Sequence, residues 1–310
     1  MSQVISRRTT YWSDVRRIHR LEYPFPVAYA CHALWGACYA VTAPGQLLAV
    51  PVILALLAAV LPIDAQNPIN AALDMAGDMA HVGKSSIGHA VRRLGPRHAV
   101  WWAGVEFTVA VLLAAAVSVW LDRPIVVAAV LAAVVLHLLY NVEPVRLKRR
   151  GWAAHVYFGL TFATLPILAT FGAVRADFPA WLWPIAVGIG VLLAARTLWW
   201  ALPDRDADAS VGDRTVVVRQ GVRPALLMAC LITVAGIALT GWGVWWRCGP
   251  AWSVLVMACT SLFLVQKLRM WFTVTDSRLP NERRMRTHTL TLVVVADVVI
   301  VLVPVLAARW

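Results

Sequence analysis

Long apolar stretches follow one another along the chain, separated by short polar breaks. Each is close to the ~20 apolar residues that an α-helix needs to cross a bilayer. The breaks hold turn or helix-stop signals, such as Pro44-Gly45 and Gly249-Pro250. The pattern predicts an all-α integral membrane protein, a bundle of nine transmembrane helices in one domain over 1–310. The expected spans are 24–42, 46–68, 99–121, 124–140, 153–173, 180–202, 224–246, 250–272 and 288–308.

Composition agrees with this pattern. Hydrophobic residues make up 60% of the 310 residues and charged residues 14%, whereas a soluble domain averages roughly 45–50% apolar and about 25% charged residues. This balance excludes a soluble globular enzyme, a disordered chain and a secreted disulfide scaffold. The five cysteines show no Cys-x-x-Cys spacing, so we interpret them as packing residues.

The net charge of +12 comes from basic residues between the apolar runs. It therefore indicates membrane topology, and we expect no nucleic-acid partner. The N-terminus and the loops after the even-numbered spans hold 24 of the 28 basic residues, when Arg196, Lys267 and Arg269 near the adjoining helix ends are counted with them. This bias predicts a multi-pass protein of the cytoplasmic membrane, in contact with the lipid bilayer, with the N-terminus in the cytoplasm and the C-terminus outside. The opposite face holds Arg123, Arg175, Arg247 and Arg309.

Acidic residues form two pairs on the predicted cytoplasmic side. Asn70, Asp74 and Asp78 recur every four residues at the end of the second span, so on a helix they share one stripe. Asp204 and Asp208 follow the sixth span at the same spacing. Two acidic stripes at the mouth of a bundle repel each other unless a cation lies between them.

Mg²⁺ is the cation that best suits these aspartates. It prefers oxygen ligands in octahedral geometry and usually takes one or two carboxylates together with phosphates and water. A diphosphate bridged by Mg²⁺ between the two stripes would balance the charges. The competing interpretation is that the aspartates are solvated and make surface salt bridges.

These segments resemble the aspartate-rich motifs of the UbiA superfamily of intramembrane prenyltransferases. Asn70, Asp74 and Asp78 are similar to the first motif, and 202–221 resembles the second motif with its Gly-x-Arg-Thr tail. The segment 140–151 resembles the Tyr-Ser-x-x-Pro-x-Arg-x-Lys stretch that follows the fourth span in the family. The resemblance covers essentially the whole chain. It implies a UbiA-like bundle with a central cavity opening near the cytoplasmic side.

Three positions depart from the family pattern. Ala71 stands where the family usually has aspartate, 84–88 replaces an Arg-Pro-x-x-Ser-Gly stretch, and Asn141 stands where serine is common. These departures suggest a divergent member of a specialised pathway, and they leave the identity of the acceptor open.

The resemblance implies a role for each motif residue. Asp74 and Asp78 would bind one Mg²⁺, Asp204 and Asp208 a second, and Asn70 would add an oxygen ligand or contact phosphate. Basic residues would clamp the diphosphate and neutralise the charge that develops on its leaving oxygen. The candidates are Arg20, Lys84, Arg146, Lys148 and Arg214.

The apolar walls of the bundle would hold the isoprenoid chain. Tyr140, Trp199 and Trp200 could stabilise a carbocation through their ring faces. Asp297, near the middle of the ninth span, could contact an acceptor or accept the final proton. A buried ion pair is the alternative for the charges within the spans, for instance Arg196 with Asp297 or with Glu106.

We therefore expect an enzyme that transfers an isoprenoid chain from a prenyl diphosphate donor to an acceptor, which is a small hydrophobic or aromatic molecule. A terpene cyclase of the same superfamily, which needs no acceptor, is the main alternative. A polyprenyl-phosphate glycosyl-type transferase is a third possibility. A transporter is the competing class, and it would release no pyrophosphate.

Overall fold

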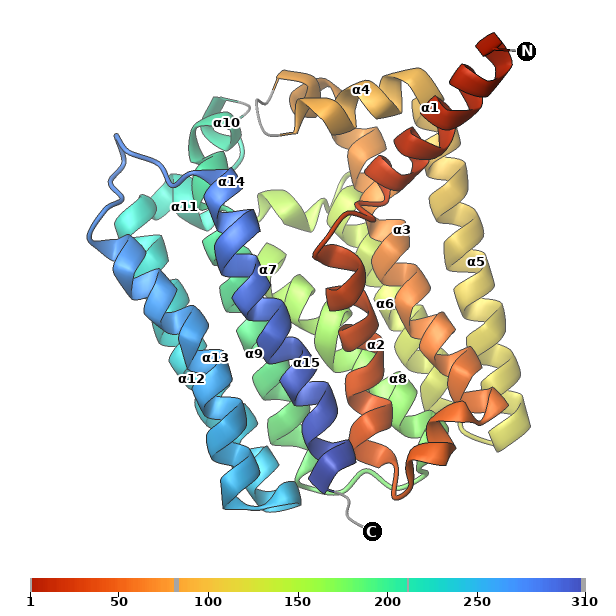
Figure 1. The fold of residues 1–310 in the computed structure, drawn as a ribbon. Coiled ribbons are helices and arrows are strands. Elements are labelled where there is room, and N and C mark those ends of the chain that lie inside the picture. The colour runs from red at the N-terminus through yellow and green to blue at the C-terminus, as the bar shows by residue number, and fades with distance from the viewer. Residues whose placement is uncertain (1, 81–83, 211, 308–310) are drawn as a thin grey trace.

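Long helices lie side by side and connect the two ends of the molecule (Figure 1). The computed structural model describes residues 2–80, 84–210 and 212–307, and this part of the chain contains helices and loops without a β-strand. One long helix, α7–α8, passes through a π-helical turn at Leu160–Thr164. The long helices are α2 (Phe25–Ala40), α3 (Val50–Ala80), α5 (Pro96–Leu121), α6 (Ile125–Asn141), α7 (Trp152–Gly159) with α8 (Leu165–Val174), α9 (Leu182–Trp200), α12 (Val222–Cys248), α13 (Pro250–Trp271) and α15 (Leu290–Ala307).

Each predicted apolar run coincides with one of these helices. Seven helices in the described ranges are long and apolar enough to cross a membrane. The other two, α6 with 17 residues and α2 with 16, are shorter. The helical membrane architecture is therefore confirmed, while the number of nine crossings stays a prediction. The predicted outer C-terminus, with Arg309, lies outside the described residues.

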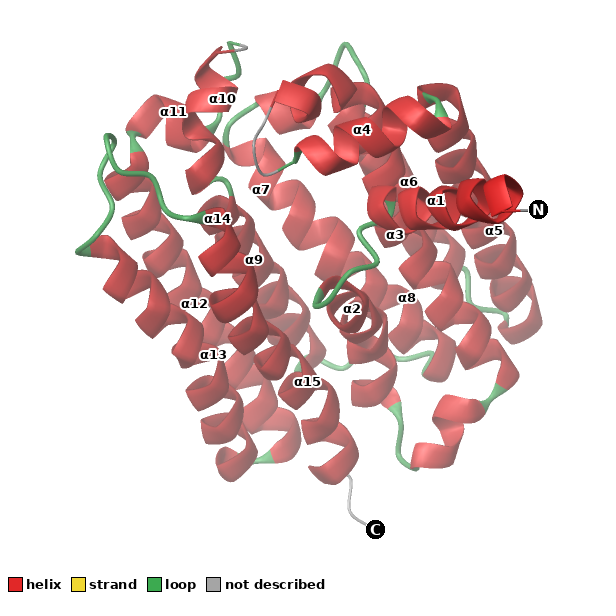
Figure 2. Cartoon of the chain, turned by 45° about the horizontal axis from the view of Figure 1, so that its top comes forward, coloured by secondary structure: helices red, strands yellow, loops and turns green. Residues whose placement is uncertain are grey.

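Most of the short helices gather at one end of the bundle, the upper end in Figure 1 and the end turned forward in Figure 2. The segment of 3₁₀-helix Pro44–Leu48 (η1) joins α2 to α3 at the opposite end. The upper end holds α1 (Ser2–Ile18), α4 (Ser85–Leu94), α10 (Arg205–Ser210), α11 (Val216–Gln220) and α14 (Glu282–Arg284). Three further short segments are the 3₁₀-helices η2 (Leu147–Arg149) and η4 (Leu202–Asp204) and the π-helix η5 (Met285–Thr289).

Glycine–proline pairs set several of the helix boundaries. Gly95 (φ 91°) and Gly249 (φ 94°) have backbone conformations that disfavour other residues, and each is followed by a proline at the first position of the next helix. The break predicted at Gly249-Pro250 is thus confirmed.

Small residues let the helices that carry the aspartates approach their neighbours closely. Alanines of α3 and α5, among them Ala55, Ala58 and Ala110, are buried against each other. Between α7 and α9, a Cβ on Gly159 would lie 2.5 Å from the carbonyl oxygen of Gly190. Such contacts are typical of helices packed within membranes. They hold α3 and α9, and hence the aspartate pairs at their upper ends, in fixed positions.

Candidate active site

The first aspartate motif lies on the last turns of α3, at the upper end of the bundle. Helix α3 continues through Pro68 to Ala80, so Asn70, Asp74 and Asp78 do share one helical stripe. Asp78 is almost completely buried, with 7% of its surface exposed, and its Oδ2 has no hydrogen-bond partner among the described residues.

Two basic side chains from the segment after α6 hold Asp74. The Nζ of Lys148 lies 2.5 Å and 2.6 Å from the two Asp74 oxygens, and it approaches Asn70 Oδ1 at 3.5 Å. Arg146 donates through Nη2 to Asp74 Oδ1 at 3.1 Å. Burial lowers the pKa of Lys148, although the nearby charge of Asp74 opposes this effect. The segment 140–151, which we call the third motif, therefore folds back onto the first.

The second aspartate motif lies where α9 ends. Asp204 closes η4 and Asp208 lies on α10. Lys84, at the start of α4, donates to Asp204 Oδ2 at 2.7 Å. Burial alone would lower the pKa of Lys84, but the charge and hydrogen bond of Asp204 raise it above its ordinary value. Lys84 is therefore a stable cation between the two motifs.

Electrostatic interactions connect the two motifs. The charge of Lys84 acts on Asp78 and on Asp208 as well as on its partner Asp204. Tyr140, on α6, interacts with charges of both motifs, namely Asp74, Asp204 and Asp208, and with Arg20. The structure thus brings the two aspartate pairs together around lysine and arginine side chains.

The tail of the second motif packs against the third motif. Asp213 Oδ1 lies 2.8 Å from Arg149 Nε, and a Cβ on Gly151 would lie 3.6 Å from the Arg214 carbonyl oxygen. The Arg214 side chain itself is exposed. Its predicted contact with a diphosphate therefore stays a prediction.

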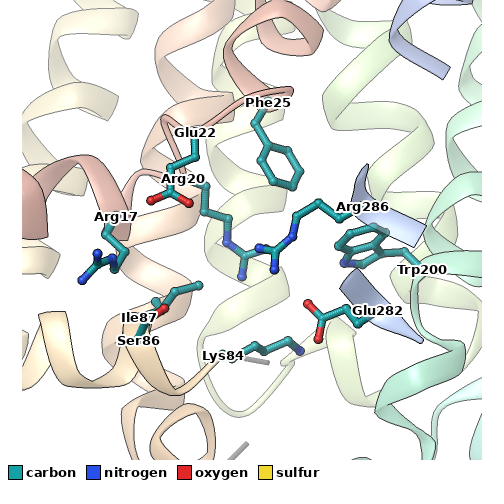
Figure 3. Close-up of a pocket in the computed structure, with 10 residues that line it drawn as sticks. All are labelled: Arg17, Arg20, Glu22, Phe25, Lys84, Ser86, Ile87, Trp200, Glu282 and Arg286. Carbon is teal, nitrogen blue, oxygen red and sulfur yellow. The ribbon is translucent and has the colours of Figure 1, made fainter. Parts of the chain in front are cut away.

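A small pocket opens beside these motifs. Most of its lining residues are charged, and Figure 3 shows the guanidinium groups of Arg20 and Arg286 next to each other near its centre. Phe25, Ile87 and Trp200 form an apolar wall. Lys84 lines this pocket and also contacts Asp204, so the pocket adjoins the second aspartate motif. The remaining lining residues are Arg17, Glu22, Ser86 and Glu282.

Trp199 does not lie where the sequence predicts. Its side chain is completely buried, and its ring meets Phe263 edge-on with the centroids 5.1 Å apart. Neighbouring residues of an α-helix point about 100° apart, so only one of the twin tryptophans can face the pocket. Trp200 does, and Trp199 packs in the core.

Asp297 is also placed differently from the expected substrate contact. Its two oxygens accept from Arg196 at 2.8 Å and 3.0 Å, and its side chain is only 3% exposed. The structure therefore contains the Arg196–Asp297 ion pair that the sequence analysis gave as the alternative to a substrate contact. The pair joins α15 to α9. The pairing satisfies both charges within the bundle.

Sequence reasoning missed the contribution of the segment before α15. Glu282 and Arg286 line the pocket, yet in the sequence they belong to one of several basic loops that all carry the same topological signal. Nothing in their spacing distinguishes them. Glu282 and Arg286 reach the pocket because the segment before α15 folds toward the residues after α1 and at the start of α4.

Comparisons with known proteins establish the family and the fold. The model of the UbiA prenyltransferase family matches residues 29–296. The chain belongs to the UbiA prenyltransferase family. Comparison with curated proteins gives no match.

Solved structures of UbiA proteins share the fold. A UbiA homologue from Archaeoglobus fulgidus bound to GPP and Mg²⁺ is 19% identical, with a TM-score of 0.65, and the match covers 95% of this chain and 98% of the other. The same homologue bound to DMAPP and Mg²⁺ has a TM-score of 0.64 at 18% identity, covering 94% and 96%. A digeranylgeranylglyceryl phosphate synthase is 10% identical, with a TM-score of 0.64 and coverage of 95% and 99%. At these identities the likeness establishes the fold.

Proposed function

We propose that this UbiA-family chain is a Mg²⁺-dependent membrane prenyltransferase. It transfers an isoprenoid chain from an allylic diphosphate to a small aromatic acceptor and releases pyrophosphate. The observation that carries the proposal is the convergence of both aspartate pairs around Lys84 and Lys148 at one end of the bundle.

The aspartates suit Mg²⁺. Asp78 presents a buried Oδ2 without a hydrogen-bond partner among the described residues, and such an oxygen is costly to bury unless a cation or a donor meets it. Asp74 and Asp78, with Asn70, would hold one ion, and Asp204 with Asp208 a second. When bound, Mg²⁺ neutralises the charge of the diphosphate leaving group.

The basic side chains of the site would bind the diphosphate. Lys148 and Lys84 each contact one aspartate motif, so they stand where phosphate oxygens bridging the motifs would lie. Arg146 stands beside Lys148 on Asp74, and Arg20 lines the adjoining pocket. Donors fixed in these positions stabilise charge that develops on a leaving oxygen.

Aromatic rings would line the path of the prenyl group. Tyr140 is stacked on Tyr157 with the ring centroids 4.0 Å apart, which fixes its orientation. Its ring lies near both aspartate pairs, and a ring face in this position can stabilise an allylic cation. Phe25 and Trp200 form the apolar wall for the chain that follows.

The membrane arrangement follows from the charge distribution. The upper end carries α1, α4, α10 and α14 (Figure 1) and most of the basic residues, so we place it in the cytoplasm. Nine crossings then put the end of α15 outside. The whole chain forms one domain, with the cavity and the active site opening toward the cytoplasm.

The test is release of pyrophosphate by the purified protein in nanodiscs. Allylic diphosphates of several chain lengths are supplied with and without Mg²⁺ and with and without aromatic acceptors. Asp74→Asn and Asp204→Asn should abolish release. Asp177→Asn is the matched control, because Asp177 is exposed and pairs with Arg175 in the loop between α8 and α9.

The products separate the possible reactions. Prenylated acceptor that forms only with Mg²⁺ and acceptor supports the proposal. Cyclic hydrocarbon formed without an acceptor would make the chain a terpene cyclase. Absence of pyrophosphate with every donor and acceptor would contradict both enzymes.

A further inference from the structure

We propose that His19, Asp64 and Glu106 form a binding site for a divalent transition-metal ion such as Zn²⁺, separate from the aspartate motifs. The three residues come from the end of α1, from α3 and from α5. Each offers one ligand atom, and these atoms all lie within 4.8 Å of one another. Two ligands on one Zn²⁺, at ~2.0–2.2 Å each, stand ~3–4 Å apart, so small side-chain movements suffice.

The histidine is oriented as a metal ligand. Its Nδ1 lies 2.8 Å from the carbonyl oxygen of Val15. A carbonyl can only accept, so Nδ1 carries the proton and Nε2 is directed into the cluster. Metal-bound histidines commonly donate their other ring nitrogen to a backbone carbonyl in this way. His19 is 4% exposed in its side chain, and Trp102 packs edge-on against its ring.

Each carboxylate presents one oxygen that no group in the described part of the chain satisfies. Asp64 Oδ1 and Glu106 Oε2 are buried and have no hydrogen-bond partner among the described residues. Glu106 Oε1 lies 2.9 Å from His19 Nε2. A proton shared by His19 Nε2 and Glu106 Oε1 makes this contact a hydrogen bond. A divalent cation would displace that proton and would at the same time meet the two unsatisfied oxygens, which the proton leaves without a partner.

The charge and donor types identify the class of ion. With the shared proton displaced, two carboxylates and a neutral imidazole would carry two negative charges, which one divalent cation balances. Such charges are expensive to bury without a counter-ion, so the ion and the ionised ligands would be bound together. An imidazole with two carboxylates suits Zn²⁺ and its neighbours in the first transition series, whereas Mg²⁺ prefers oxygen ligands alone.

A bound ion would join three helices next to the active site. His19 directly precedes Arg20, which lines the pocket. Asn67, on the turn of α3 after Asp64, donates to the carbonyl oxygen of His19 at 3.3 Å. The ion would therefore fix the end of α1 and the backbone from which Arg20 reaches toward the aspartate motifs.

The test counts zinc on the full-length protein. Chelator-treated protein in nanodiscs is dialysed against Zn²⁺ with excess Mg²⁺, and bound zinc is measured by mass spectrometry. We expect one zinc ion per chain in the wild type, and a higher midpoint of thermal unfolding with zinc. Asp64→Asn and Glu106→Gln should weaken binding by more than the ~10–100-fold that loss of a supporting hydrogen bond costs.

Two controls locate the ion. Glu143→Gln should keep the zinc, because Glu143 is a 61% exposed surface glutamate. The double variant Asp74→Asn/Asp204→Asn should keep it as well. Loss of zinc in that double variant alone would assign the ion to the aspartate motifs. Equal zinc content in wild type, Asp64→Asn and Glu106→Gln, or none in any of them, would mean that protons alone balance the cluster, and either result overturns the proposal.

Discussion

The Nζ of Lys148 lies 2.5 Å and 2.6 Å from the two carboxylate oxygens of Asp74. The lysine comes from the short helix after α6, and the aspartate from the upper end of α3. A single ammonium group thus connects the third and first sequence motifs. In the proposed reaction, it exchanges part of this contact for oxygens of the diphosphate.

Replacing Lys148 with methionine should reduce kcat/KM for pyrophosphate release by about 10²–10³-fold, the usual cost of removing a donor from a developing oxyanion. Methionine keeps the apolar stem and removes only the charge. Arg92→Gln is the matched control, since Arg92 is an exposed cation on α4. Equal losses in both variants would show a general effect of surface charge.

The pair of Lys84 and Asp204 can be tested by a double-mutant cycle. Lys84→Met and Asp204→Asn should each lower turnover, and the double variant should be no more active than either. In thermal unfolding, the two changes should couple by roughly 0.5–3 kcal/mol, because the groups are in contact. Near wild-type turnover in the double variant would mean that the pair serves the fold alone.

Asp297→Asn should destabilise the protein by about 3–5 kcal/mol, because it leaves Arg196 buried without its counter-charge. Thermal unfolding in nanodiscs measures the effect. Arg196→Met combined with Asp297→Leu should recover much of the loss, since an apolar pair needs no charge balance. Lost turnover with unchanged unfolding would instead restore Asp297 as a substrate contact.

The twin tryptophans should respond differently to alanine. Trp199→Ala removes a fully buried ring and should cost about 3–5 kcal/mol of stability. Trp200→Ala should mainly raise KM for the prenyl diphosphate, because Trp200 lines the pocket. Thermal unfolding and steady-state kinetics on both variants distinguish the two effects. A stability loss for Trp200→Ala as large as that for Trp199→Ala would contradict this division.

The aspartate motifs could be predicted because their spacing matches the helical repeat. Asn70, Asp74 and Asp78 need only a continuous helix to share a face, and α3 provides it. Lys148 and Lys84 were candidates by resemblance, but their individual partners, Asp74 and Asp204, follow from how separate segments fold together. The position of Arg286 in the pocket could not be predicted, because a basic residue between two apolar runs shows the same sequence pattern wherever its loop folds.

The helical membrane architecture, the break points and the two aspartate pairs follow from local features of the chain. These features are apolar length, glycine–proline signals and the helical period. Three relationships instead depend on how the helices pack: Arg196 pairs with Asp297, Trp200 and not Trp199 faces the pocket, and His19 meets Asp64 and Glu106. Each of these contacts joins residues on different helices or depends on the rotation of one helix against its neighbours. Side-chain packing between helices sets that rotation, so it cannot be predicted from the periodicity of a single segment.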